Sequence, residues 1–509
     1  MNGALGRWFR FAENGTTLAR DTVAGITTFI VMSYIIFVNP AILGFAGIEG
    51  LQDIGLQFDA VLTSTCLVAG VMTIAMGLFT NRAYAIAPGL GLNAFVAFTL
   101  VAGEGLGFPE AMGLVVIEGL AITILVVVGL REKIMRAIPL ELKKAIAVGI
   151  GLFIGFIGLV NAGLVVQGVP VVDLQKFTNW TSFIAIAGIA ITIVLRARGI
   201  PGDLLVGIVL TTVLATIINW AEDYQVYTGP ANERYARWPD DLFEAPNFGL
   251  VGEISFDAFS TLPFLAAVAF VFTLMISDFF DTMGTLVGVG KQAGYLDAQG
   301  ELPEIQRPLL VDSVAAAAGG FASASSATTY IESAAGVGVG GRTGWVSLIT
   351  GALFFPFMFI APLIGMVPPQ ATAAALIVVA YLMITVLSEA EEEADLEEGV
   401  LLTEDSPVRG RLDEPLTSPR RDVVTPTGRI VAGINFQDLA LGLAAALTII
   451  MMPFSFSIAD GIGFGFISYC LVRVAQGLWS RIHPLMWVAT AAFVLYFSID
   501  ILQMEFDWL

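Results

Sequence analysis

The chain is poor in charged residues and in the side chains that most often carry catalysis. Only 13% of its 509 residues are charged, about half the share found in a soluble domain. It has one histidine and two cysteines, and both cysteines, Cys66 and Cys470, lie in apolar segments. This scarcity argues against a disulfide framework and a metal cluster. It also argues against a membrane-embedded enzyme, which would need a nucleophile–base pair or a metal.

Basic residues are scarcer than acidic ones. The 24 lysines and arginines face 44 acidic residues, so the formal net charge is −20. An acidic balance argues against nucleic acid or anionic lipid as a partner. Much of the acidity lies in two stretches, residues 221–257 and residues 389–405.

Long apolar runs dominate the rest of the chain. The sequence is 56% hydrophobic, with a mean hydropathy of +0.82. Hydropathy rises repeatedly over roughly 18–22 residues, the length that crosses a hydrocarbon core. The apolar segments lie near residues 22–44, 58–79, 84–102, 110–130, 142–164, 181–196, 203–220, 262–287, 308–322, 327–340, 344–365, 369–387, 436–453, 457–478 and 484–503. The first fourteen form two sets of seven, and the last is an extra C-terminal segment. The sequence therefore predicts an all-α polytopic membrane protein with 14 transmembrane segments.

The distribution of basic residues predicts the orientation. If the N-terminus is inside and every segment crosses, 21 of the 24 bases fall in inside loops, as the positive-inside rule requires. We therefore expect a cytoplasmic N-terminus at 1–21 and an extracellular acidic loop at 221–261. Residues 388–430, polar and acidic, are expected to form a disordered cytoplasmic insertion.

Two segments differ from ordinary spanning helices. The segment at 84–102 carries Pro88, Gly89 and Gly91 near its start, and the segment at 327–340 opens with small and hydroxyl residues. Each is predicted to be an extended piece followed by a half helix. Interrupted segments at matching places in two halves are the best sequence indication of a transporter's binding site. These two are the third of each set of seven.

Aligning the two halves predicts a polar side chain at the start of each half helix. The alignment equates Leu92-Asn93-Ala94 with Ile331-Glu332-Ser333. Asn93 offers both a hydrogen-bond donor and an acceptor, and a carboxylate accepts from N–H groups. The pair therefore suits a neutral, planar, hydrogen-bonding solute.

Three carboxylates lie at membrane depth, where an ionisable side chain is by default a functional-site hypothesis. They are Asp278, Asp281 and Glu332. Asp278 and Asp281 are three residues apart, so on a helix they share a face. Two such charges cannot both ionise cheaply, which suits a carboxyl group that takes up and releases a proton.

Other candidates are weaker. Phe95 and Tyr330 flank the expected site and could stack on a base. Asp312 and Glu118 are better explained as structural links between helices, and Asp21 as a cap of the first helix.

The motifs resemble those of a known family. In order, they are RDTVAGITTFIVMSYIIFVNPAIL, APGLGLNAFVAF, SDFFDTMGTLVGVG, TTYIESAAGVGVGGRTG and MMPFSFSIADGIGFGFISY. They look like the AzgA-type purine permeases of the nucleobase–cation symporter group, which also holds the uracil and xanthine permeases. DFFDTMGTL together with YIES is typical of the AzgA branch.

The resemblance implies two inverted repeats that build a core domain and a gate domain. It places purine contacts at Asn93, Asp278 and Glu332, and it ties Gly91 and Asp281 to the transport step. The implied ranges are core at 22–130 and 262–365, and gate at 140–220, 369–387 and 436–478, with an extra segment at 484–503.

The expected function is uptake of adenine, guanine or hypoxanthine across the cell membrane by proton symport and alternating access. No cofactor beyond the proton gradient is expected, and a homodimer stays open. The alternatives are a uracil or xanthine permease, an anion carrier of the same fold, and a passive channel. Three site carboxylates disfavour an anion by repulsion, and no basic residue is expected there.

Overall fold

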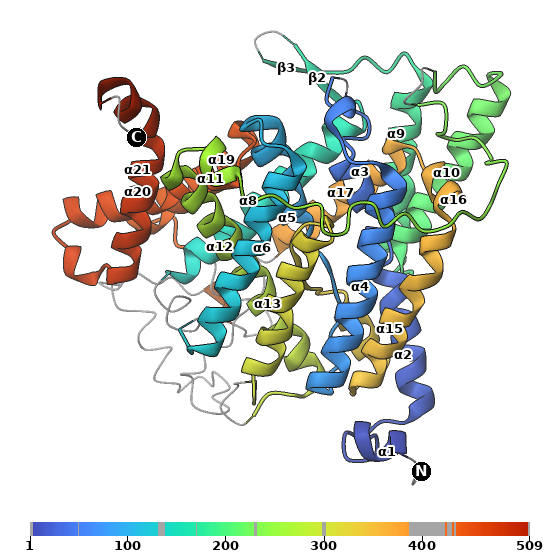
Figure 1. Cartoon of the computed structure of the whole chain (residues 1–509), viewed down its shortest axis with the longest axis horizontal. Helices are drawn as coiled ribbons and strands as arrows, with labels where there is room; N and C mark the ends of the chain where they lie inside the picture. Colours follow the sequence, from blue (N-terminus) through green and yellow to red (C-terminus); the bar gives the residue numbers. More distant parts are fainter. Residues whose placement is uncertain are drawn as a thin grey trace.

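The structure is a computed structural model that describes residues 4–48, 50–130, 138–168, 171–228, 232–297, 302–385, 423–424, 430–431 and 434–506. Most of it is helical (Figure 1). The longer helices are α2 (Leu18–Met32), α3 (Ile35–Leu43), α4 (Phe58–Thr80), α6 (Phe108–Val127), α8 (Leu140–Asn161), α9 (Trp180–Ala197), α10 (Asp203–Ala221), α12 (Phe264–Ala293), α13 (Gln306–Phe321), α15 (Gly344–Phe354), α17 (Pro369–Ile384), α19 (Leu439–Ser455), α20 (Ile458–Ala475) and α21 (Pro484–Phe506).

Short elements connect these helices. The short helices are α1 (Ala4–Phe9), α5 (Leu90–Ala94), α11 (Ala258–Thr261), α14 (Ser333–Gly338), α16 (Ala361–Gly365), the π-helix η2 (Phe95–Gly103), and the 3₁₀ turns η1 (Gln52–Ile54), η3 (Phe355–Phe359) and η5 (Trp479–Arg481). The strands form three antiparallel pairs: β1 (Ile86–Pro88) with β4 (Ala327–Thr329), β2 (Val165–Gln167) with β3 (Val172–Leu174), and β5 (Val423–Val424) with β6 (Ile430–Val431).

Eight helices in the described part of the chain are long and apolar enough to cross a membrane. Five shorter apolar helices accompany them, at Leu90–Gly103, Gly344–Phe359, Pro369–Ile384, Leu439–Ser455 and Pro484–Ser498. The prediction of a mainly helical, multi-pass membrane protein is confirmed. The insertion predicted at 388–430 lies outside the described residues, apart from the two short strands β5 and β6.

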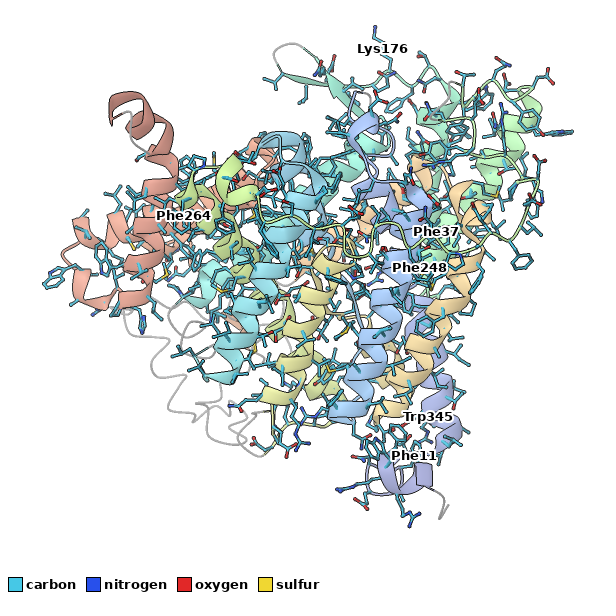
Figure 2. All side chains as sticks on the ribbon, viewed as in Figure 1. Phe11, Phe37, Lys176, Phe248, Phe264 and Trp345 are labelled. Atoms are coloured by element: carbon cyan, nitrogen blue, oxygen red, sulfur yellow. The ribbon has the colours of Figure 1, made fainter. Side chains whose placement is uncertain are left out.

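Two stretches that are expected on opposite sides of the membrane lie at opposite ends of the bundle. Figure 2 shows Lys176 at one end of the molecule and Phe11 and Trp345 at the opposite end. Lys176 belongs to a loop expected outside, whereas Phe11 lies in the N-terminal stretch expected inside. The Trp345 ring packs edge-on against Phe9 with centroids 5.5 Å apart, so the N-terminal stretch docks on the start of α15.

The first predicted segment, 22–44, is not one continuous helix. Its helix α2 ends at Met32, Ser33 and Tyr34 form a turn, and α3 starts at Ile35. The predicted segment is one candidate membrane span, Leu18–Leu43, with this turn inside it. Nothing in the uniformly apolar run marks the break, because Pro40, the residue that usually interrupts helices, lies six positions further on inside α3.

The two interrupted segments meet through a short strand pair, as predicted. Ile86 pairs with Thr329, Ala87 with Thr328, and Pro88 with Ala327. Proline removes a backbone donor and disfavours a helix, and β-branched residues favour extended backbone. The sequence of both segments therefore supports strands at this place. Each strand leads into a half helix, α5 continued by η2 on one side and α14 on the other.

The predicted register of the half helices is correct for one of them only. Glu332 is the N-cap of α14, as expected. In the other half the N-cap is Gly89, so Asn93 is the fourth residue of α5 rather than its start. The difference arises because one residue separates β1 from α5, whereas three residues separate β4 from α14.

Buried acids on neighbouring helices hold the strand pair in place. The Asp312 carboxylate accepts from the Thr329 amide at 2.9 Å, from the Thr329 hydroxyl at 2.8 Å and from the Thr282 hydroxyl at 2.6 Å. Glu118 accepts from the Ser326 hydroxyl at 3.1 Å. Both acids are thus structural links, as predicted.

Asp21 does not cap its own helix. Thr17 is the N-cap of α2, and its hydroxyl accepts from the Arg20 amide. The buried Asp21 carboxylate instead accepts from the amides of Arg342 and Thr343 at 3.1 and 3.2 Å. It therefore binds the two residues that precede α15, a helix more than three hundred residues away, and the prediction that it caps the first helix was wrong.

The C-terminal helix α21 packs on two other helices. Phe493 packs edge-on against Phe466 of α20 at 5.9 Å and against Phe272 of α12 at 6.1 Å between ring centroids. Tyr496 contacts Phe270 of α12 at 5.4 Å. The extra segment predicted at 484–503 is thus a helix fixed to the bundle.

The long acidic loop before α12 is anchored to the ends of several helices. Backbone bonds join Ala236 to Met366, Gly252 to Phe321 and Ser255 to Pro109 at 2.8 Å each. Phe248, labelled in Figure 2, lies on this loop. The loop therefore follows the surface of the bundle.

Replacing Asp312 by alanine should destabilise the fold. The variant leaves the buried Thr329 amide and two threonine hydroxyls without their acceptor. We expect a loss of about 1–3 kcal/mol of unfolding free energy, measured as a lower melting temperature in detergent. Asp241→Ala, on the exposed loop, is the control. Equal melting temperatures for the two variants would contradict the structural role of Asp312.

Candidate functional site

The site lies where the two interrupted segments meet α12 and the break in the first segment. Helix α12 contacts β4 and both half helices, α5 and α14, and α14 packs along α2. This arrangement brings together four stretches that are far apart in sequence. Asn93, Asp278, Asp281 and Glu332 all lie on these elements.

Asn93 is the most unusual polar residue of the site. Its side chain is fully buried on α5, and neither its amide nitrogen nor its amide oxygen has a hydrogen-bond partner among the described residues. A buried amide without partners costs free energy, so native proteins rarely keep one. Asn93 therefore has both a donor and an acceptor available for a bound molecule.

Glu332 lies at the head of α14 and is half-buried. The Tyr34 hydroxyl donates to its Oε1 atom at 2.7 Å. Tyr34 comes from the break between α2 and α3, and its side chain is only 2% exposed. The sequence reasoning missed Tyr34, because a tyrosine within an apolar run carries no distinguishing signal.

The two aspartates of α12 lie in different environments. Asp278 is fully buried, whereas the Asp281 side chain is accessible at the surface of the isolated chain. Asp281 also lies within electrostatic range of Glu332 and Asp312.

The two predicted aromatic residues have packing and structural contacts. Phe95 is buried and packs edge-on against Phe270 of α12, with ring centroids 6.0 Å apart. The Tyr330 hydroxyl donates to the backbone oxygen of Pro88 and so joins the two interrupted segments. Their contact with a substrate remains a prediction.

Gly91 lies at a very close approach between helices. A Cβ atom at this position would come within 2.6 Å of the Cγ2 atom of Ile150 on α8. Real Cβ atoms do not reach such distances, so only glycine fits while Ile150 keeps its place. The expected core and gate ranges therefore touch each other at Gly91.

One basic residue lies near the site, contrary to the sequence interpretation. Arg196, on α9, donates to Asp203 of α10 at 3.1 Å. Both side chains lie within electrostatic range of Glu332. Arg196 was missed because it reaches the site from a segment remote in sequence, and its charge is largely balanced by Asp203.

Among the described residues, no group of three or more histidine, cysteine or acidic side chains could hold a metal ion.

Comparison with known proteins gives the family. Residues 20–400 match the Permease family (Xan_ur_permease). The chain belongs to this family. The chain is 36% identical over 494 residues to adenine permease AdeP of Escherichia coli K12, covering 97% of this chain and 96% of AdeP. It is 34% identical over 493 residues to guanine/hypoxanthine permease PbuG of Bacillus subtilis, covering 96% and 98%. This member of the permease family is a transporter and not an enzyme.

Two solved structures share the fold of this permease. The transmembrane domain of a cyanobacterial bicarbonate transporter, BicA, matches with a TM-score of 0.52 and 16% identity, covering 72% of this chain and 88% of that domain. The murine anion transporter Slc26a9 matches with a TM-score of 0.58 and 11% identity, covering 90% and 68%. At these identities the likeness concerns the fold alone.

Gly91→Ala should impair transport through the contact with Ile150. The added methyl group overlaps the Ile150 side chain, so α5 and α8 must move apart. We expect at least a tenfold lower uptake rate and partial recovery in the double variant Gly91→Ala/Ile150→Ala, measured in uptake assays.

Gly107→Ala is the matched control, because a Cβ atom there meets nothing closer than 3.6 Å. Failure of Ile150→Ala to restore any activity would show that the cost of the methyl group arises elsewhere.

Proposed function

We propose that this permease imports purine nucleobases by proton symport and alternating access. The observation that carries the proposal is the pair formed by Asn93 and Glu332 on the two half helices. Relatives similar over nearly the whole chain are named as adenine and guanine/hypoxanthine permeases. The purines in these names carry hydrogen-bond donors and acceptors that the amide and carboxyl groups of this site can bind.

A purine base is flat and uncharged, with N–H donors and ring-nitrogen acceptors on its edge. The Asn93 amide can donate to a ring nitrogen and accept from an N–H group. Glu332 and Asp278 can accept from ring N–H or exocyclic amino groups. Phe95 and Tyr330 complete the proposed binding set as aromatic walls.

Proton coupling is assigned to Asp281, and the transport movement to the contact at Gly91. Asp281 lies within electrostatic range of Glu332. A proton on one of these acids reduces the repulsion between them. Protonation would therefore change the free energy of bringing Glu332 and the substrate together.

The proposed architecture has fourteen transmembrane segments in two inverted repeats. The core comprises 22–130 and 262–365, and the gate comprises 140–220, 369–387 and 436–478. Alternating access would move the core against the gate at the α5–α8 contact. The excess of basic residues in the loops expected inside supports a cytoplasmic N-terminus in the cell membrane.

An anion carrier is the main alternative, because the two structural neighbours are named as bicarbonate and anion transporters. Arg196 near Glu332 favours it, but Arg196 is paired with Asp203. The three carboxyl groups of Asp278, Asp281 and Glu332 would repel an anion more strongly than the single paired arginine would attract it. The uracil and xanthine permeases are the other alternative.

Glu332→Gln should weaken purine uptake. The variant keeps the shape but loses the charge that strengthens the hydrogen bonds, so we expect about a 10- to 100-fold loss. The measurement is uptake of labelled hypoxanthine in cells that lack purine carriers. Adenine, guanine, uracil, xanthine and bicarbonate are the competitors.

Glu222→Gln, on an exposed position, is the control for Glu332→Gln. Unchanged uptake in Glu332→Gln would refute the site. Competition by uracil equal to that by purines would refute the purine assignment, and competition by bicarbonate would favour the anion carrier.

The Asn93→Leu variant should bind purine more weakly but keep the stability of the wild type. Leucine is close to asparagine in shape, and no hydrogen bond within the described structure is lost, so the melting temperature without purine should not fall. Purine binding should weaken at least tenfold, since two hydrogen bonds to the base disappear. Isothermal titration calorimetry and thermal melting measure the two effects.

Asn39→Leu is the matched control for Asn93→Leu. Asn39 is equally buried, but its amide nitrogen donates to the Thr65 hydroxyl at 2.8 Å and to the Ala324 oxygen at 3.1 Å. This variant should lower the melting temperature. A fall of the same size in Asn93→Leu would show that Asn93 serves the fold.

A further inference from the structure

The hydrogen bond between Tyr34 and Glu332 joins the break in the first segment to the head of a half helix. The donor and acceptor atoms are 2.7 Å apart. Tyr34 is buried, so its hydroxyl cannot turn to bulk water without moving its helix. The bond therefore links two elements that are 298 residues apart in the sequence.

Close helix packing fixes where Glu332 lies relative to Tyr34. A Cβ atom at Gly336 would come within 2.1 Å of the Thr28 hydroxyl and 2.7 Å of the Ala24 oxygen. Thr28 precedes Tyr34 whereas Gly336 follows Glu332, so α14 runs antiparallel to α2. The helices can approach this closely because glycine has no side chain. Packing thus sets the register of α14, and the hydroxyl sets the rotamer of Glu332.

The break in the first segment puts the tyrosine in this position. Helix α2 ends at Met32, the amide of its C-cap Ser33 donates to the Phe29 oxygen, and Tyr34 is the N-cap of α3. In one continuous helix the side chains after residue 33 would point in different directions around the helix axis. The turn therefore aims Tyr34 at Glu332.

We propose that Tyr34 is a positioning residue for Glu332. Its hydroxyl binds Oε1 and so turns Oε2 away from α2, toward the substrate. This inference rests on the proposed function, because the substrate that Oε2 meets is the purine. Tyr34 itself need not touch the base.

A hydroxyl suits both protonation states of the carboxyl group. It donates to the charged form, and when Glu332 carries a proton it can accept from the acid O–H. The proton comes from solvent and returns to it, while Tyr34 keeps its own. Glu332 can thus stay in place throughout the proton cycle.

Several other charged or titratable groups act on Glu332. They come from α12, from the start of α14 and from the α9–α10 pair, and they are Asp281, Tyr330, Arg196 and Asp203. Arg196 and Asp203 are bonded to each other and partly cancel. Among the described contacts, Tyr34 is the side chain that donates a hydrogen bond to Glu332.

The test is Tyr34→Phe, which removes one oxygen atom. A hydrogen bond to a carboxylate favours its charged form, so the variant should protonate Glu332 about one pH unit higher. Infrared spectroscopy of the purified protein follows the protonated carboxyl band, assigned by its disappearance in Glu332→Gln. In uptake assays the KM for hypoxanthine should rise about tenfold, with a smaller change in kcat.

Tyr227→Phe is the matched control. Tyr227 is also buried and donates to Gln370 at 3.0 Å, but it packs in a separate cluster with Ile184, Ala215 and Tyr235. It should leave the carboxyl band and the KM unchanged. A Glu332 band that titrates at the same pH in Tyr34→Phe and the wild type overturns the proposal.

A second substitution keeps the test valid if Tyr34→Phe does not fold. Difluorotyrosine at position 34 keeps the ring and the hydroxyl but donates more strongly, so the band should appear at lower pH. An unchanged band would again overturn the proposal. A shifted band together with no purine uptake by the wild type would support the role of Tyr34 and refute the purine function.

Discussion

The structure depends on satisfying the backbone of two irregular stretches at membrane depth. Within a bilayer each unpaired backbone group costs several kcal/mol. The pairing of β1 with β4 satisfies the inner edges of both stretches. At the outer edges, the Thr73 hydroxyl binds both the amide and the oxygen of Ile86, and Asp312 binds the amide of Thr329. Pro88 has no amide to satisfy, and its oxygen accepts from Tyr330.

This solution explains why the neighbourhood is rich in acids with different tasks. Asp312 and Glu118 serve the strand pair, since Asp312 accepts from threonine groups and Glu118 Oε2 accepts from a serine hydroxyl. Asn93 and Glu332 lie just beyond the strands, on helices whose starting points the strands determine. The same irregular backbone thus creates the need for structural acids and positions the proposed binding groups.

The sequence predicts the features that arise from local chemistry. The two interruptions follow from Pro88, Gly89 and Gly91 in one half and from a hydroxyl-rich run in the other. The acidic site candidates could be picked out because an ionisable side chain at membrane depth costs free energy and is seldom kept without a function. Asp312 and Glu118 were predicted as links between helices, and their hydrogen bonds to the strand pair and its flanking residue confirm this.

Features that depend on packing between distant segments were not predictable. The turn at Tyr34 has no local signal, and the proximity of Arg196 to Glu332 comes from the packing of other segments around the site. The position of Asn93 within α5 was missed because the link after β1 is two residues shorter than the link after β4. Asp21 was assigned to the nearer helix start, although the Thr343 end of another helix lies against it.

The attachments of the strand pair also have a mechanical consequence. Thr73 lies on α4, Glu118 on α6, Thr282 on α12 and Asp312 on α13, and each is bonded to one of the strands or to its flanking residue. Any movement that keeps these bonds must carry the four helices together as one rigid block. Ile150 of α8 takes no part in these bonds but meets Gly91 in a close apolar contact, so a displacement of α8 against this block would shear that contact.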